Sequence, residues 1–105
     1  MKNAIVTGGS RGIGAAIVKM LAENGYNVVL NYNKSFDEAM KIKNEFDNVE
    51  IFKADVSNFD EDVNLVNFAI SRFGNVDLLV NNAGCDIFRH NSRYFDRRFR
   101  QNFKN

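Results

Sequence analysis

The sequence predicts an α/β domain in which a parallel sheet carries helices on both faces. Short apolar runs alternate along the 105 residues with longer segments whose apolar residues recur every three or four positions, which is the pattern of alternating strands and helices. Glycine or asparagine punctuates most of the junctions, and proline is absent. Strands joined by helical crossovers form a parallel sheet, and we expect the strand order 3-2-1-4.

The first unit of this fold is a strand, a turn and a helix. Residues 4–6 are an apolar run that leads into the glycine-rich stretch 7–14, and a helix is expected after it. Asn24 and Gly25 favour the end of that helix, and residues 28–30 form a second buried strand. The residues expected on the core face of the helix are Ile13, Ala16, Ile17, Met20 and Leu21.

A second helix is expected to begin after Ser35. Ser35 and Glu38 have the spacing of a capping box, and the helix should run to about Asp47. A third strand follows over residues 49–54. The residues expected to face the core from this helix are Phe36, Met40 and Phe46.

A third helix and a fourth strand complete the pattern. Ser57 with Asp60 predicts the helix cap, Gly74 closes the helix, and residues 76–81 form the strand. The apolar residues that recur along this helix are Phe59, Val63, Val66, Ile70 and Phe73.

The carboxyl ends of strands 1 and 4 should bound a ligand crevice, because the order 3-2-1-4 reverses the direction of chain travel between them. The turn there leads a strand into a helix N-terminus, whose free N–H groups and positive dipole end attract phosphate. Gly8, Gly12 and Gly14 form the pattern G-x-x-x-G-x-G, which lets backbone approach a diphosphate. Ala15 and Ala16 replace the Lys and Ser/Thr that a P-loop needs after its last glycine, which disfavours ATP chemistry.

Three motifs together resemble the short-chain dehydrogenase/reductase family, whose nucleotide-binding half is a Rossmann-type fold. They are Thr7 to Gly14, Asp55-Val56 and Asn81-Asn82-Ala83-Gly84, in the family's order. The chain is most similar to 3-oxoacyl-[acyl-carrier-protein] reductases and related ketone reductases over residues 2–84. Taken singly, the second and third motifs are equally well explained as a helix cap and a turn.

The resemblance implies a dinucleotide site and assigns residues to it. The diphosphate and the adenosine ribose would be surrounded by Gly8, Ser10, Arg11, Gly12 and Ile13. The adenine would be flanked by Asp55 and Val56, and the ribose side would be lined by Asn82, Ala83 and Gly84.

The end of the second strand indicates which dinucleotide is preferred. An acidic side chain there would bind the ribose 2′-hydroxyl of NAD and repel the 2′-phosphate of NADP. Residues 31–35 contain no carboxylate, whereas Lys34, Ser35 and Arg11 can donate hydrogen bonds to a phosphate. NADP(H) is therefore expected over NAD, with a solvated Lys34 as the alternative.

The catalytic residues that the resemblance implies are largely missing from this sequence. Family members use a Tyr and a Lys four residues later, and none of Tyr26, Tyr32 and Tyr94 is followed by Lys at that spacing. Asn102 resembles the family's helix Asn that helps to hold a proton-relay water, with a frayed C-terminal turn as the alternative. We expect the chain alone to be inactive.

The sequence divides into a nucleotide-binding half and a tail. Residues 1–84 are acidic overall, and residues 85–105 form a basic, partly helical continuation. Its apolar Phe95, Phe99 and Phe103 favour a helix packed on the sheet over a surface for nucleic acid or lipid. Without a fifth strand the fourth would have a bare edge, which predicts self-association.

Composition narrows the partners and the location. A net charge of +1 gives no reason to expect nucleic acid or an anionic membrane. Cys85 is the only cysteine, which favours a cytoplasmic protein without disulfides, and neither it nor His90 has partners for a metal site. The leading hypothesis is an incomplete NADP(H)-dependent ketone or 3-oxoacyl reductase; a non-catalytic NADP-binding module and a non-functional remnant are the alternatives.

Overall fold

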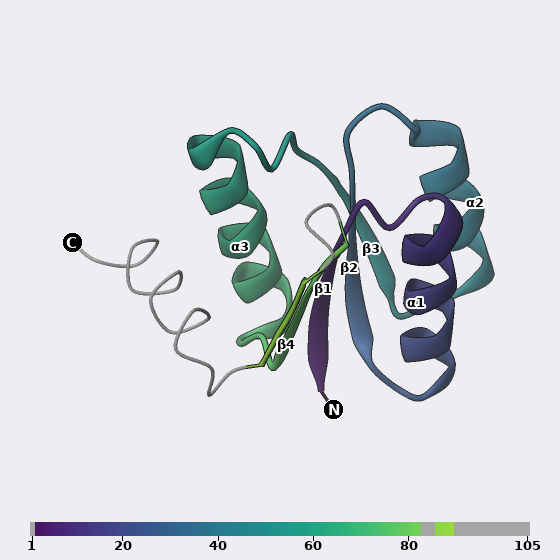
Figure 1. Cartoon of the computed structure of the whole chain (residues 1–105). Coiled ribbons are helices and arrows are strands. Elements are labelled where there is room, and N and C mark those ends of the chain that lie inside the picture. The colour runs from purple at the N-terminus through teal and green to yellow at the C-terminus, as the bar shows by residue number, and fades with distance from the viewer. Residues whose placement is uncertain (1, 83–85, 90–105) are drawn as a thin grey trace.

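A computed structural model of the chain shows a twisted five-stranded sheet between helices (Figure 1). The structure describes residues 2–82 and 86–89. The elements in chain order are β1 (Asn3–Thr7), α1 (Gly12–Glu23), β2 (Asn27–Tyr32), α2 (Phe36–Glu45), β3 (Val49–Lys53), α3 (Phe59–Phe73), β4 (Leu78–Asn81) and β5 (Asp86–Arg89).

The strands lie in the order β3-β2-β1-β4-β5, which confirms the predicted arrangement of the first four. β1 is the middle strand of the five, with β2 and β4 parallel to it on either side. Its residue Ile5 stands opposite Val29 on β2 and Leu79 on β4. This arrangement brings the carboxyl ends of β1, β2 and β4 to one edge of the sheet.

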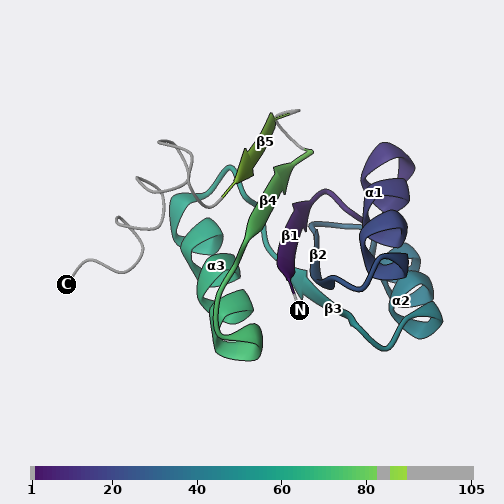
Figure 2. The same cartoon turned by 90° about the horizontal axis from the view of Figure 1, so that it is seen from below.

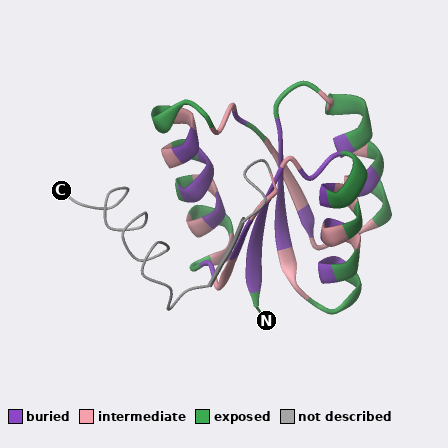
Figure 3. Cartoon of the chain, viewed as in Figure 1, coloured by how far each residue is buried: buried purple, intermediate pink, exposed green. Residues whose placement is uncertain are grey.

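Helices cover both faces of the sheet. α1 and α2 lie on one face and α3 lies on the other (Figures 1 and 2). Successive strand residues alternate between the two layers, so that Val28 and Leu30 pack toward α1 and α2 whereas Val29 packs toward α3. β1 and β2 are buried on both faces, as Figure 3 shows, which explains their continuous apolar sequences.

The expected core faces of the helices are only partly correct. Ile13, Ala16, Met20, Phe36 and Phe59 were expected in the core and are instead exposed. In α1 the cause is the close approach of Gly14 to the Gly8 carbonyl in the turn after β1, which sets the rotation of the helix about its axis. The buried residues of α1 are consequently Gly14, Val18, Leu21 and Ala22. Phe36 and Phe59 open their helices, and burial begins only at the fourth residue of each, Ala39 and Asp62.

Two predicted caps differ from the observed ones. Ser35 precedes α2 as expected, but its side chain makes no capping hydrogen bond. The cap of α3 is Asn58, whose Oδ1 accepts from the Glu61 amide at 3.2 Å. Ser57 does not cap α3, because its hydroxyl donates to Asp55 Oδ1 at 2.6 Å.

The outer edge of β4 is not bare, which corrects the prediction made for it. β5 pairs antiparallel with β4, with Asn81 opposite Asp86 and Leu78 opposite Arg89. The chain returns alongside β4 and satisfies that edge through backbone pairing alone. The argument for self-association through β4 therefore loses its premise. The helix expected around Phe95 lies outside the described residues.

No helix in the described part of the chain combines the length and the apolar character that spanning a membrane requires.

The two faces of α3 give a test of this packing. Leu65 is 0% exposed and Phe59 is 58% exposed. We expect Leu65→Ala to lower the free energy of unfolding by about 2–5 kcal/mol, because it leaves a cavity beside the sheet. Phe59→Ala should change that free energy by about 0.5 kcal/mol or less. Urea unfolding measures both, and equal losses would contradict the observed orientation of α3.

Candidate functional site

A pocket of about 510 Å³ opens at the carboxyl ends of the central strands. Its walls come from the turn between β1 and α1, the segment between β2 and α2, and the residue after β4. It brings together many of the residues predicted from sequence and adds Tyr32 and Asn33. The lining residues are Gly8, Ser10, Arg11, Gly12, Tyr32, Asn33, Lys34, Ser35 and Asn82.

The turn after β1 is held by two asparagine side chains. The Gly8 amide donates to Asn31 Oδ1 at 3.1 Å, and the Gly8 carbonyl accepts from Asn82 Nδ2 at 3.1 Å. The next amide, that of Gly9, donates to the Asn31 carbonyl at 2.9 Å. The backbone at Gly8 has a φ of +61°, which few residues other than glycine adopt.

Two glycines let α1 approach the sheet closely. A Cβ on Gly14 would overlap the Gly8 carbonyl oxygen and lie 2.8 Å from Asn82 Nδ2. A Cβ on Gly9 would lie 2.9 Å from Val18 Cγ2. Gly9 was not singled out from sequence, because only the folded structure brings it against Val18 in the second turn of α1.

Gly12 has a different role, since nothing lies within 4 Å of where its Cβ would be. Its φ is +57°, and it opens α1 at the wall of the pocket. A side chain there would occupy space that the pocket now offers. The glycine therefore supplies both a left-handed backbone and an unobstructed surface.

The start of α1 is suited to an anion. The N-cap Arg11 makes no side-chain capping bond, and the first turn carries no acidic residue. The first amides of a helix have no acceptor within the helix, and the dipole adds positive potential there. Among the salt bridges of the described residues, none involves Arg11 or Lys34. The pocket thus combines helix amides with two cations, which is the chemistry of a phosphate site.

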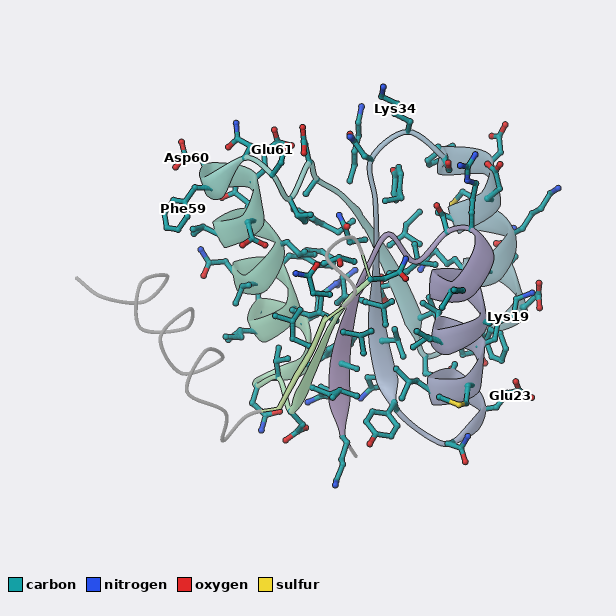
Figure 4. All side chains as sticks on the ribbon, in the orientation of Figure 1. Lys19, Glu23, Lys34, Phe59, Asp60 and Glu61 are labelled. Carbon is teal, nitrogen blue, oxygen red and sulfur yellow. The ribbon has the colours of Figure 1, made fainter. Side chains whose placement is uncertain are left out.

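Asp55 lies after β3 and does not line the pocket. Its Oδ1 accepts from the Ser57 hydroxyl at 2.6 Å and the Ser57 amide at 3.0 Å, while its own amide donates to Glu61 Oε1 at 2.8 Å. These Ser57 bonds lower the pKa of Asp55, with a smaller contribution from the charge of Lys34 and an opposing one from desolvation. Figure 4 shows Lys34 and Glu61 at the same end of the molecule.

The other predicted site residues fall in three groups. Val56 follows Asp55 outside the pocket and packs against the core on the α3 side. Ile13 is exposed on α1 and does not line the pocket. Ala83, Gly84 and Asn102 lie outside the described residues.

Asn31 is a further residue of this site that the sequence did not reveal. In the sequence it indicated only that β2 ends without a carboxylate, yet its side chain holds the neighbouring turn. The available signal was a polar residue at the end of a largely apolar strand. Such a side-chain amide is buried and needs hydrogen-bond partners.

Gly14 and Gly12 should respond differently to substitution by alanine. Gly14→Ala is expected to cost about 3 kcal/mol of unfolding free energy, because the new methyl group would meet a fixed carbonyl and displace Asn82. Gly12→Ala should cost about 1–2 kcal/mol, for the left-handed backbone alone. Denaturant unfolding compares the variants, and a larger loss in Gly12→Ala would contradict the close packing at Gly14.

Ser57→Ala should raise the pKa of Asp55, because it removes the hydroxyl that lowers this pKa most. The sign follows from linkage: a carboxyl whose folded pKa is depressed stabilises the fold above its unfolded pKa, and that contribution is lost as pH falls through the folded pKa. NMR titration of the Asp55 carboxyl carbon measures the shift. Identical titration curves in the two proteins would show that Ser57 does not control this group.

The chain matches known sequences along most of its length. The sequence pattern of the short chain dehydrogenase family matches residues 2–105. The 3-oxoacyl-[acyl-carrier-protein] reductase FabG of Staphylococcus epidermidis is 48% identical over 87 residues, which are 79% of this chain and 36% of that protein. The (S)-acetoin-forming diacetyl reductase of the same species is 41% identical over 91 residues, or 81% of this chain and 34% of the relative. The chain therefore spans only about a third of the length of these relatives.

Solved structures agree with these matches. A short-chain dehydrogenase/reductase of Serratia marcescens has a TM-score of 0.74 and 45% identity, over 77% of this chain and 35% of that one. A short chain dehydrogenase of Burkholderia cenocepacia in complex with NADP has a TM-score of 0.74 and 39% identity, over 76% and 34% of the two chains. The fold, the glycine turn and the match over residues 2–105 thus place this chain in the short chain dehydrogenase family.

Proposed function

We propose that this chain binds NADP(H) as the nucleotide-binding part of a carbonyl reductase. The observation that carries the proposal is the uncapped start of α1, which faces a pocket edged by two cations and has no acid in its first turn. A diphosphate could accept hydrogen bonds from the amides at the start of α1 and pair with these cations. The substrate class proposed is a ketone or a 3-oxoacyl thioester, on the basis of the 3-oxoacyl-[acyl-carrier-protein] reductase that the chain resembles.

The residues present would hold the dinucleotide along the edge of the sheet. The diphosphate would rest on the amides that open α1, because those of Gly8 and Gly9 are already bonded to Asn31. We assign Ser10, Arg11, Gly12 and Ile13 to this region on the resemblance.

The remaining assignments concern the two ends of the cofactor. Asp55 and Val56 are proposed to flank the adenine, and Asn82, Ala83 and Gly84 to line the ribose side. Asn102 is proposed to help hold a water in a proton relay. When bound, the nicotinamide would supply the hydride, and the groups of this chain would only bind and orient it.

Preference for NADP over NAD is supported by charge. Arg11 and Lys34 line the pocket, and Ser35 precedes α2 with a hydroxyl that makes no capping bond. Among the described residues, none that lines the pocket carries a carboxylate to repel a 2′-phosphate. Two of the similar solved structures, the Burkholderia enzyme and a blue fluorescent protein from a metagenomic library, are complexes with NADP and NADPH.

A non-catalytic NADP-binding module is the second candidate. It is favoured by one observation, that no Tyr in the sequence is followed by Lys four residues later. Carbonyl-reductase activity of the purified chain would exclude it, whereas cofactor binding without turnover would favour it. We also propose a cytoplasmic location, because a single cysteine allows no internal disulfide.

The cofactor proposal predicts a specific pattern of affinities. The chain should bind NADPH more tightly than NADH, and Gly12→Val should abolish binding of both, because its side chain would fill the space in front of α1. Lys34→Ala should weaken NADPH by about tenfold and NADH by less than about twofold, since only NADPH carries the 2′-phosphate. Cofactor fluorescence titration measures all six affinities, for the wild type and the two variants with each cofactor.

Lys19→Ala is the matched control, because Lys19 lies on α1 away from the pocket and pairs with Glu45. It removes the same charge from the chain and should leave both affinities unchanged. If the Lys19 and Lys34 variants lost the same affinity for NADPH, the preference for NADPH would come from net charge and not from the position of Lys34. A folded chain that binds neither cofactor would refute the proposal.

A further inference from the structure

We infer that Asn31 is a positioning residue that joins the two loops on which the dinucleotide would rest. The inference rests on the proposed function, and it concerns a residue that lies behind the pocket wall rather than in it. Asn31 is 2% exposed and belongs to the carboxyl end of β2, between the turn that follows β1 and the loop that follows β3.

The side chain of Asn31 bonds to both loops. Its Oδ1 accepts from the Gly8 amide at 3.1 Å, and its Nδ2 donates to the Ala54 carbonyl at 3.0 Å. An amide side chain has an acceptor at one atom and donors at the other, so it can satisfy an N–H on one side and a C=O on the other. A carboxylate offers no donor and an ammonium no acceptor, so neither could make both bonds.

The backbone beside this side chain makes the same connection. The Gly9 amide donates to the Asn31 carbonyl at 2.9 Å, and the Ala54 amide donates to the Tyr32 carbonyl at 2.9 Å. Ala54 is followed directly by Asp55, the residue assigned to the adenine. One short segment of β2 thus sets the positions of the turn that follows β1 and of the loop that follows β3.

This connection has a consequence for binding. A rigid dinucleotide site gains affinity when its separate contacts are already in place before the ligand arrives. Removing the Asn31 side chain would leave the partly buried Gly8 amide and the buried Ala54 carbonyl without this partner, and each loop could then move by itself. Affinity for the whole dinucleotide should fall even though Asn31 does not line the pocket.

Asn48 offers a matched control in the same chain. Its Nδ2 donates to the carbonyls of Ala22 at 3.0 Å and Tyr26 at 2.7 Å, which lie near the end of α1 and in the connection to β2. Like Asn31, it joins two backbone segments through one amide. Unlike Asn31, it stands before β3, at the opposite edge of the sheet from the pocket.

The test compares Asn31→Ala and Asn48→Ala by NADPH titration, at a temperature where thermal melts show both variants folded. Both should unfold at a lower temperature than the wild type. Asn31→Ala should weaken NADPH by about tenfold or more, and Asn48→Ala by less than about twofold. Asn31→Leu, which fills nearly the same volume without polar atoms, provides the same comparison if the alanine variant does not fold.

Amide hydrogen exchange provides a readout that needs no cofactor. The Gly8 and Gly9 amides should exchange faster in the Asn31 variants than in the wild type and in Asn48→Ala, because Gly8 loses its acceptor. If wild-type chain binds NADPH and both asparagine variants bind it equally well, the positioning role is wrong and the proposed function stands. If the wild type binds no NADPH, the proposed function fails and the role in cofactor binding fails with it. Unchanged Gly8 exchange would then also refute the link between the loops.

Discussion

The contact between Gly14 and the Gly8 carbonyl is the constraint on which much of this structure depends. The approach is so close that a single added methyl group would overlap the oxygen. It fixes the rotation of α1 about its axis and so decides that Val18 and Leu21 enter the core. The same carbonyl accepts from Asn82, which connects the turn to the end of β4. Core packing and pocket shape are therefore set by one short stretch of backbone.

This constraint explains why the fold was easier to predict than the details of its packing. The strand order follows from buried β-branched runs alternating with helices, which is a property of the chain that needs no tertiary information. The rotation of α1 depends on the contact of Gly14 with the Gly8 carbonyl after β1, and apolar spacing alone placed Ile13 and Met20 on the wrong face. Periodicity identified the helix correctly but not which side of it meets the sheet.

For the site, too, local sequence patterns were informative and contacts between distant residues were not. Gly8, Gly12, Arg11 and Lys34 line one pocket, and the turn chemistry of a strand-to-helix connection that singled them out is encoded locally. Asn31 was missed because its role consists of bonds to backbone far away in sequence. The prediction that Ser57 caps α3 was wrong because the Ser57 hydroxyl bonds to Asp55. The cap of α3 is the neighbouring Asn58.

Asparagine side chains have different roles at the amino and carboxyl edges of the sheet. At the amino edge, Asn3 donates to Asn75 at 2.6 Å and accepts from Asn27 at 3.0 Å, and its amide donates to Asp77 at 2.9 Å, so that polar side chains there satisfy one another.

At the carboxyl edge, Asn31 and Asn82 bond instead to the backbone of the Gly8 turn. Their bonds hold that backbone in place while the amides that open α1 are not used by a capping side chain. A preformed turn with a positive, uncapped helix start is what an anionic ligand requires, and both features lie at the carboxyl edge.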